Sequence, residues 1–477
     1  MRGLTTGLIA SALAFGAQAC GDDNVVDGTG VRSGSRLRAR YLVADGARQF
    51  VGFHDRERDE DCTFDLRPGQ TTARCLPAST SAGGFMDAAC SVPMFGVGAD
   101  TCSLPTPYVH QAAMACGGGI ARLWRVGTLQ RPSTVYFVDS MGVCRSTPAG
   151  STNVFYAAIE EVPLDRFVSA AWREAAGEGR VLERFLAGED GSRIAVGAYD
   201  RVLDVPCTVS NIAGQLACHP TVSEGGWLWS DDTCTTQVVE RDTAQFPVCA
   251  GPMPPYAAIT HPGSSCRVTR TLVEIGPRAT PANLYFGLGE ACDPAANDGR
   301  ELYELGAEVP FPDLAQAQRA DVGSGRIHTR MLVADGARGV DTGLVDRDFE
   351  QPCRPGLTRD GVMRCLPSRG FTIRAYYGDA ACGVRVPIAS MLAECDGSAD
   401  GYPQTPVVVE DEPPVIACGN PISKIYSVGA EYAPGTVYDR NGATCEPIMW
   451  ERTDYRMWAL GEEIAPDRFV AVDELTE

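Results

Sequence analysis

The chain has 477 residues, 44% hydrophobic and 8% aromatic, which is enough apolar material for about two to four domains or one large repeat assembly. It carries 41 basic and 61 acidic residues, a net charge of −20, and Lys424 is its single lysine. So acidic a surface repels phosphate backbones, which excludes nucleic acid as a partner, and Lys424 lies outside any Gly-rich phosphate loop, which excludes P-loop nucleotide hydrolysis.

The N-terminus has the features of an export signal. Arg2 precedes an apolar run, residues 4–15, that is too short to span a bilayer, and small residues precede Cys20. We expect residues 1–19 to be a signal peptide and residues 20–33 a polar tether. The stretch ending at Cys20 resembles a bacterial lipobox, which implies a lipid on Cys20. We therefore expect a cell-envelope protein anchored in the outer membrane and facing the periplasm or the cell surface, with ordinary secretory cleavage near Cys20 as the alternative.

The rest of the chain repeats itself. The block at residues 41–77 contains VADGAR and ends in RCLP, the block at 331–367 has the same features, and a more diverged copy lies at 185–220. We predict three repeats, over residues 34–176, 177–322 and 323–477. The Asp-Gly pair in each copy, beginning at Asp45, Asp190 and Asp335, predicts a hairpin turn, because glycine accepts positive φ.

Cysteine usage follows the same repeat. Removing Cys20 from the 19 cysteines leaves 18, six per repeat, and the shortest gap between neighbours is 11 positions. This predicts structural disulfides in an oxidising compartment and disfavours zinc, which needs CxxC or CxxH pairs. We favour pairing of neighbours in order, because the first gap in each repeat is nearly constant and would bridge adjacent strands. The pairs in the first repeat are then Cys62 with Cys75, Cys90 with Cys102, and Cys116 with Cys144; the other candidates are Cys207, Cys218, Cys234, Cys249, Cys266, Cys292, Cys353, Cys365, Cys382, Cys395, Cys418 and Cys445.

The pattern of short, alternating segments rich in β-branched and aromatic residues predicts an all-β fold. Each repeat divides into two halves of four short strands, and the second halves begin with IARLWRVG at Ile120, VTRTLVEIG at Val268 and ISKIYSVG at Ile422. Six four-stranded units predict a six-bladed β-propeller-like ring of three double-blade repeats. Three tandem β-domains of about 145 residues are the alternative.

These blocks carry a family resemblance. The ACGDD after the signal, the ADGAR and RCLP block and the later VG, VY and Cys block resemble the cysteine-rich repeat lipoproteins of unknown function from high-GC Gram-negative bacteria. The resemblance covers nearly all of the mature chain. It implies a location and an architecture but no activity, because the motifs are structural.

Features present in every copy predict structural roles. Asp55, Asp200 and Asp346 could form a ring of ligands around a channel, but a feature repeated three times at fixed spacing is more economically explained as support for the fold. In the same way Asp87, Asp231 and Asp379, each three positions before a cysteine, predict turns that hydrogen-bond their own backbone.

Features found in one copy are the better functional candidates. Trp227 and Trp229, in the middle copy, would share one face of a strand and could stack a sugar or a peptide, or could equally be a buried stripe. The sequence has no GxSxG or HExxH motif, and we expect no catalytic residue, metal or cofactor.

Two functions remain. The favoured one is a non-catalytic, disulfide-stabilised envelope lipoprotein that binds a protein or carbohydrate ligand or has a structural role. The alternative is an extracellular propeller enzyme, a hydrolase or lyase acting on a carbohydrate or other polymer through carboxylates in a central channel. Charged residues from unaligned positions that converge in one deep pocket would favour the enzyme.

Overall fold

The structure is a computed structural model. It describes residues 30–477 apart from 66–71, 99–106, 113–119, 140–141, 151–152, 213–214, 221–222, 226, 242–253, 262–268, 289–290, 298–299, 336, 368–371, 393–406, 413–421, 432–435, 442–443 and 449–454. Strands dominate this part of the chain, and its helical segments are the short 3-10 turns η1 (Leu164–Arg166), η3 (Phe311–Asp313) and η5 (Pro466–Arg468). The predicted all-β class is confirmed.

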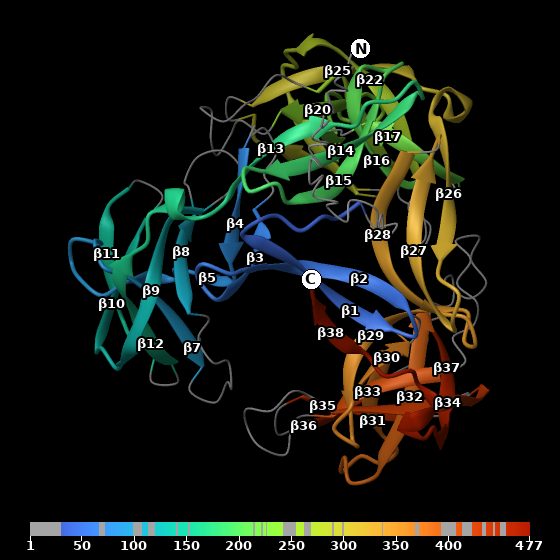
Figure 1. Cartoon of the computed structure of the whole chain (residues 1–477). Coiled ribbons are helices and arrows are strands. Elements are labelled where there is room, and N and C mark those ends of the chain that lie inside the picture. The colour runs from blue at the N-terminus through green and yellow to red at the C-terminus, as the bar shows by residue number, and fades with distance from the viewer. Residues whose placement is uncertain are drawn as a thin grey trace, which may run out of the picture.

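The first half of each repeat folds into a four-stranded unit at the centre of the molecule (Figure 1). These units are β1 (Leu37–Ala44), β2 (Ala47–Asp55), β3 (Glu60–Phe64) and β4 (Thr72–Pro77); β14 (Val181–Gly188), β15 (Arg193–Asp200), β16 (Val205–Ile212) and β17 (Gln215–Pro220); and β27 (Ile327–Ala334), β28 (Ala337–Asp346), β29 (Gln351–Thr358) and β30 (Met363–Pro367). In each unit a β-bulge interrupts the pairing of the first two strands at a corresponding place, which bends the hairpin.

One further strand per repeat joins neighbouring units. β13 (Ser169–Glu174) pairs with β4 and β14, and β26 (Ala315–Val322) pairs with β17 and β27. The chain end makes the third join, because Ala471 bridges to Arg364 of β30 and β38 (Asp473–Thr476) pairs with β1. Strand pairing therefore runs without a break around a closed ring, in which the last strand of the chain is hydrogen-bonded to the first.

A carboxylate reinforces each join. The Asp190 side chain accepts the backbone N–H groups of Arg36 at 3.1 Å and Leu37 at 2.7 Å. Asp335 accepts the N–H of Arg180 at 2.5 Å, and Asp45 accepts the N–H of Arg326. The aspartate of each repeat therefore accepts a hydrogen bond from the preceding repeat, in a cycle in which the first repeat accepts from the third. Burial alone would raise the pKa of Asp190, but the N–H donors and the Ser192 hydroxyl outweigh it and hold that pKa below its usual value.

The three turns that carry these aspartates differ in one copy. Asp45 and Asp335 have positive φ in two-residue turns that join Ala44 to Ala47 and Ala334 to Ala337, as predicted. In the middle copy the last paired residues are Ala187 and Arg193, so the turn is longer and Asp190 keeps a negative φ. The carboxylate nevertheless reaches the same backbone groups of its neighbour.

The second half of each repeat forms an outer module, and the three modules project from separate corners of the ring (Figure 1). The first contains β5 (Ser79–Ser81), β6 (Gly84–Phe85), β7 (Pro93–Gly98), β8 (Tyr108–Ala112), β9 (Ile120–Gln130), β10 (Thr134–Val138), β11 (Cys144–Pro148) and β12 (Asn153–Glu161). The second contains β18 (Ser223–Gly225), β19 (Leu228–Trp229), β20 (Gln237–Arg241), β21 (Tyr256–His261), β22 (Thr269–Ala279), β23 (Leu284–Leu288), β24 (Ala291–Ala295) and β25 (Glu301–Glu308). The third contains β31 (Thr372–Tyr377), β32 (Arg385–Leu392), β33 (Val407–Glu412), β34 (Ile422–Glu431), β35 (Val437–Asn441), β36 (Thr444–Ile448) and β37 (Tyr455–Glu463).

The division into halves differs from the prediction. The strand at Gly84–Phe85 precedes Ile120, where we predicted the second half to begin, yet it belongs to the outer module. The first two modules are also sheets of eight strands rather than four. Six four-stranded blades are therefore not confirmed. What the described residues establish is a ring of three four-stranded units with three larger outer modules, of which the first two are separate sheets and the third is joined to the ring by the parallel pairing of β34 with β29.

Six disulfides join described cysteines. Cys62–Cys75, Cys207–Cys218 and Cys353–Cys365 bridge neighbouring strands, as predicted. The other three are Cys90–Cys144, Cys234–Cys292 and Cys382–Cys445, so the predicted pairs of Cys90 with Cys102 and Cys116 with Cys144 are wrong. The reason is topological, because β10 pairs with both β6 and β11 and so brings the turn after β6 beside the start of β11. Cys20, Cys102, Cys116, Cys249, Cys266, Cys395 and Cys418 lie outside the described residues.

Candidate functional site

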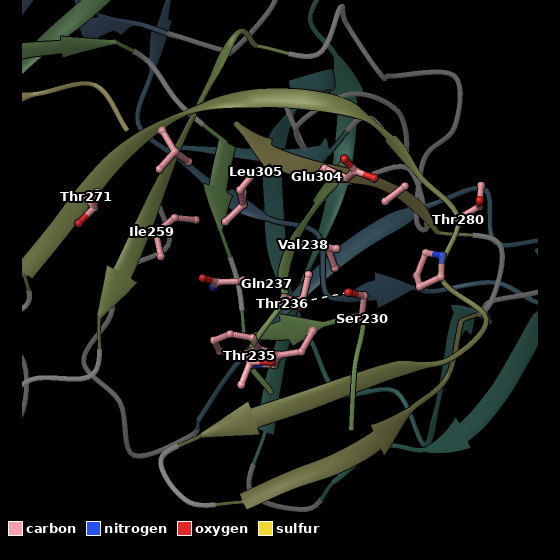
Figure 2. A pocket seen from close by; sticks show the side chains of 14 residues that line it. Ser230, Thr235, Thr236, Gln237, Val238, Ile259, Thr271, Thr280, Glu304 and Leu305 are labelled. Atoms are coloured by element: carbon pink, nitrogen blue, oxygen red, sulfur yellow. Dashed lines mark hydrogen bonds between the residues drawn. The ribbon is translucent and has the colours of Figure 1, made fainter. Parts of the chain in front are cut away.

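The outer module of the middle repeat contains a cavity of about 820 Å³. Its walls come from β19 and the turn after it, from β20, β21, β22 and β25, and from the segment after β22 (Figure 2). The lining residues are Trp229, Ser230, Thr235, Thr236, Gln237, Val238, Ile259, Thr271, Val273, Ala279, Thr280, Pro281, Glu304 and Leu305. A cavity of this size lies within the range of sites that take drug-sized ligands.

A rigid turn forms one wall. The Thr233 hydroxyl donates to the Asp231 carboxylate, as do the backbone N–H groups of Thr233, Thr235 and Thr236. These hydrogen bonds, that of the Thr233 hydroxyl foremost, lower the Asp231 pKa well below its usual value. Cys234, in the same turn, has a φ of 50° and is tied by a disulfide to Cys292 on β24. Asp87 and Asp379 bind the backbone of their own turns in the same way, which confirms the predicted turn at all three positions.

Trp229 lies at the start of that turn, and its position depends on a glycine. A Cβ added to Gly287 on β23 would lie 2.8 Å from Trp229 Nε1 and 2.6 Å from Cys234 Sγ. Gly287 pairs with Cys292 on the neighbouring strand. In the other two modules the residues that pair with the matching cysteines, Cys144 and Cys445, are Val138 and Arg440. Gly287 therefore lets the indole N–H edge pack directly against β23, where Nε1 is buried without a hydrogen-bond partner among the described residues.

Two side chains that line the cavity are smaller than their counterparts in the other modules. Val273 and Thr271 on β22 lie three and five positions before Gly276. Trp124 and Arg122 on β9 of the first module lie at the same distances before Gly127, so the two pairs correspond. In the first module the Arg122 guanidinium lies 4.7 Å above the Trp124 ring and forms an ion pair with Glu161. The third module has Tyr426 and Lys424 at these positions. Bulky aromatic and cationic side chains thus occupy, in two copies, the positions that valine and threonine occupy in the middle copy.

The cavity combines an apolar floor with a polar rim. Val238, Ile259 and Val273 are buried, whereas Thr235, Thr280 and Glu304 are exposed. Figure 2 shows Ile259 and Thr271 toward one end of the cavity and Ser230 and Thr280 toward the other. Among the lining residues, Glu304 is the one charged side chain, and the other polar groups are hydroxyls of serine and threonine and the amide of Gln237.

The two predicted stacking residues separate in the structure. Trp229 lines the cavity, and it corresponds to Phe85 and Tyr377, each of which lies two positions before the turn aspartate of its copy. Trp227 precedes the two-residue strand β19, is half-buried and does not line the cavity, although its carbonyl accepts the N–H of Gly287 at 3.0 Å. Sequence reasoning missed Thr271, Val273 and Glu304. A signal for Thr271 and Val273 was present in the sequence: when the segments that begin at Ile120, Val268 and Ile422 are aligned, these two residues are smaller than their counterparts.

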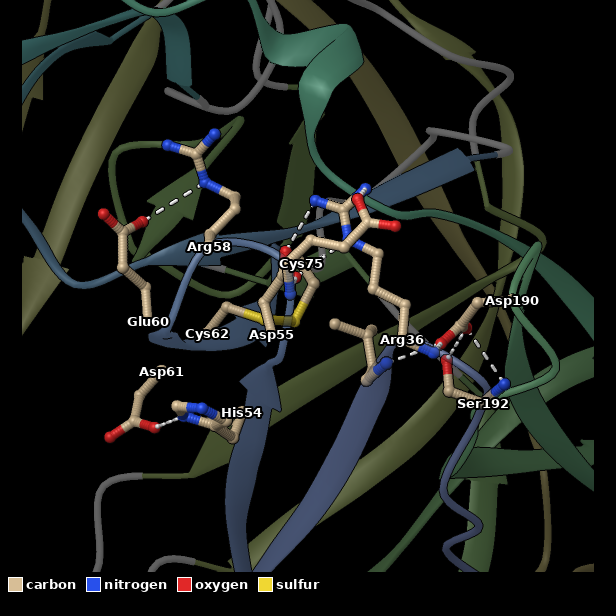
Figure 3. The surroundings of a disulfide bond; sticks show 12 residues. Arg36, His54, Asp55, Arg58, Glu60, Asp61, Cys62, Cys75, Asp190 and Ser192 are labelled. Atoms are coloured by element: carbon tan, nitrogen blue, oxygen red, sulfur yellow. Dashed lines mark hydrogen bonds and ion pairs between the residues drawn. A yellow bond between two sulfur atoms is a disulfide. The ribbon is translucent and has the colours of Figure 1, made fainter.

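The repeated aspartates Asp55, Asp200 and Asp346 each bind an arginine of their own repeat and so form three clamps. Arg36 Nε and Nη2 lie 2.8 and 2.7 Å from the two oxygens of Asp55 (Figure 3). Arg36 Nη2 also donates to the carbonyl of Arg166. Arg180 with Asp200 and Arg326 with Asp346 repeat this arrangement, and each aspartate side chain is at most 2% exposed. Each clamp ties the start of its repeat to the 3-10 turn near that repeat's end. The described residues contain no cluster of three or more His, Cys, Asp or Glu able to hold a metal ion.

Comparison with known proteins gives a family and no activity. Residues 13–469 match the model described as "Family of unknown function (DUF7481)". No curated protein and no solved structure matches the chain. In the part of the chain that the structure describes, no helix has the length and apolar character needed to cross a membrane.

Proposed function

The chain belongs to this family of unknown function, and we propose that it is a non-catalytic binding protein of the cell envelope. The ring acts as the scaffold, and the middle outer module binds a ligand in its cavity. The observation that carries the proposal is that Val273 and Thr271 leave a cavity of about 820 Å³ where the first module packs Trp124 beneath Arg122.

Two sequence features and the disulfides support the envelope location. Six disulfides are consistent with an extracellular or envelope protein, because cytosolic thiols are kept reduced. The apolar run before Cys20 and the polar tether after it support export and lipidation, with the anchor in the outer membrane. Expression of the full chain and of a Cys20→Ala variant, followed by membrane fractionation and mass spectrometry of the N-terminal peptide, tests the anchor. Release of the variant into the soluble fraction is the expected result.

The composition of the cavity favours binding over hydrolysis. Glycoside cleavage generally uses two carboxylates on opposite sides of the scissile bond, and Glu304 is the one carboxylate among the lining residues. The neighbouring Asp231 carboxylate is already occupied by backbone N–H groups of its own turn. Incubation with polysaccharides and measurement of new reducing ends checks this point, and no increase over buffer is expected.

The first module provides the design of a cavity-filling variant. Thr271→Arg combined with Val273→Trp copies the Arg122 and Trp124 pair, which this fold already accommodates in another copy. A thermal-shift screen of a chemically diverse library against residues 21–477, oxidised, would identify ligands. We expect at least one compound to stabilise the wild type and to have no effect on the filled variant. A library that stabilises both proteins equally, or neither, would contradict the proposed role of the cavity.

A further inference from the structure

We propose that the cavity binds a neutral, hydroxyl-rich ligand, a short oligosaccharide, with an apolar face of one sugar ring packed against Trp229. This inference rests on the proposed binding function and adds the chemical class of the ligand. It follows from the hydrogen-bonding capacity, the charge and the apolar surface of the lining residues.

The hydroxyl groups in the turn present acceptors to the cavity. The Ser230 hydroxyl donates to the Thr236 carbonyl at 3.2 Å, and the Thr235 hydroxyl donates to Asp231 Oδ1 at 3.0 Å. A hydroxyl has one proton and two lone pairs. Because these two hydroxyls already donate their proton within the protein, they can only accept hydrogen bonds from a ligand. The Glu304 carboxylate, when ionised, also only accepts. The site therefore suits a ligand with several donors, which is what a saccharide's hydroxyl groups supply.

Trp229 contributes apolar surface and no donor. Its Nε1 edge packs against Gly287, away from any described hydrogen-bond partner, so the surface it offers to the cavity is ring carbon. Ile259, Val273 and Leu305 extend this apolar surface over the floor. A pyranose ring has one face of C–H groups and an edge of hydroxyls, and it can cover an aromatic ring while its edge reaches the hydroxyls of the wall.

Charge excludes an anionic ligand. None of the lining residues is Arg, Lys or His, and Glu304 would repel a carboxylate or phosphate at the rim. The net charge of −20 adds a repulsive field over the surface. A polyamine could pair with Glu304, but it would leave the wall hydroxyls and the apolar floor without matching groups, which disfavours it.

The experiment titrates the oxidised protein, residues 21–477, with maltotetraose, cellotetraose and chitotetraose, and with tetragalacturonate and spermidine as anionic and cationic probes, by isothermal calorimetry. Trp229→Ala removes the stacking surface. The control is Phe85→Ala, which removes the aromatic residue at the same turn position of the first module. Glu304→Gln removes the rim charge at an exposed position where folding is not at risk.

We expect at least one neutral tetrasaccharide to bind, and Trp229→Ala to weaken that binding by about tenfold or more while Phe85→Ala leaves it unchanged. Glu304→Gln should weaken the neutral saccharide by about threefold to tenfold. Since Trp229→Ala could disturb its turn, the filled variant with Thr271→Arg and Val273→Trp serves as the second test and should also lose binding.

Several results would overturn the assignment. Binding of spermidine alone, lost in Glu304→Gln, would make the ligand cationic. A saccharide that binds equally to all variants would occupy another place on the protein. Failure of all three neutral saccharides, while a library compound still distinguishes the wild type from the filled variant, would refute the ligand class and leave the binding function intact. Failure of both experiments would refute both proposals.

Discussion

The clamp between Arg180 and Asp200 gives the sharpest prediction about stability. Asp200 is fully buried and accepts Arg180 Nε at 3.0 Å and Nη2 at 2.8 Å, and it also accepts the N–H of Val202 at 2.9 Å. The substitution Asp200→Ala leaves the Arg180 guanidinium, whose side chain is 24% exposed, with the Asp313 carbonyl as its remaining described partner. The variant therefore carries an uncompensated, largely buried cation.

The expected cost follows from that burial. Removing one partner of a buried ion pair typically costs about 3–5 kcal/mol, and we expect the lower end, about 3 kcal/mol, because Arg180 keeps a carbonyl partner and some contact with solvent. Replacing both partners with apolar residues, Arg180→Met with Asp200→Leu, should recover most of the loss, because no charge is then left unpaired. The double variant should thus be more stable than Asp200→Ala.

Urea unfolding of the oxidised protein, followed by far-UV circular dichroism, measures the effect, and native-state hydrogen exchange locates it in the second repeat. The matched control is Glu161→Ala, which breaks the exposed Arg122–Glu161 pair and should cost about 0–1 kcal/mol. An Asp200→Ala variant no less stable than Glu161→Ala would refute the reasoning, as would a double variant less stable than Asp200→Ala.

Three further predictions concern the cavity, the ring and the turns. Gly287→Ala places a Cβ against Trp229 Nε1, so it should cost about 1–3 kcal/mol and shift the tryptophan fluorescence, whereas Val138→Ala at the matching position should leave the emission unchanged. Deleting residues 473–477 removes β38 from β1 and should lower stability by about 1 kcal/mol for each lost hydrogen bond, with new proteolytic cleavage near β1 as the readout. Hydrogen bonds from Ser91 and Val92 lower the Asp87 pKa from 3.8 to about 2, so the support this turn gives to folding is complete above pH 4 and is lost as the pH falls through about 2; Asp87→Asn should abolish this acid transition in the amide exchange of residues 91 and 92.

Local chemistry allowed much of the scaffold to be predicted from the sequence. The alternation of apolar residues fixed the class of secondary structure, and the Asp-Gly pairs at Asp45 and Asp335 fixed two hairpins, because their backbone conformation is set within a few residues. The turns at Asp87, Asp231 and Asp379 were predictable for the same reason. The short disulfides, such as Cys62–Cys75, follow from strands that are adjacent in sequence.

Pairing between distant segments was not predictable in the same way. Cys90 bonds to Cys144 because β10 lies between β6 and β11, and no local feature of either cysteine indicates that neighbour. The cavity was missed for a different reason. Trp229 was singled out in the sequence because it is part of an aromatic cluster found in one copy. The decisive change is the smaller side-chain volume at Val273 and Thr271, and a reduction in volume forms no recognisable sequence motif.

The ring and the modules are under different physical constraints, and this explains why the proposed site lies in a module. Around the ring, Asp45, Asp190 and Asp335 each bind a neighbouring repeat, so a change in one copy disturbs the closure of all three. In the third copy β34 of the outer module pairs with β29 of the ring, whereas the outer module of the middle copy meets the ring through an apolar cluster that includes Ala217, Leu272 and Leu314. Its remaining surface can diverge without opening the ring. A binding site can therefore arise by replacing two side chains on β22, at the cost of packing in one module only.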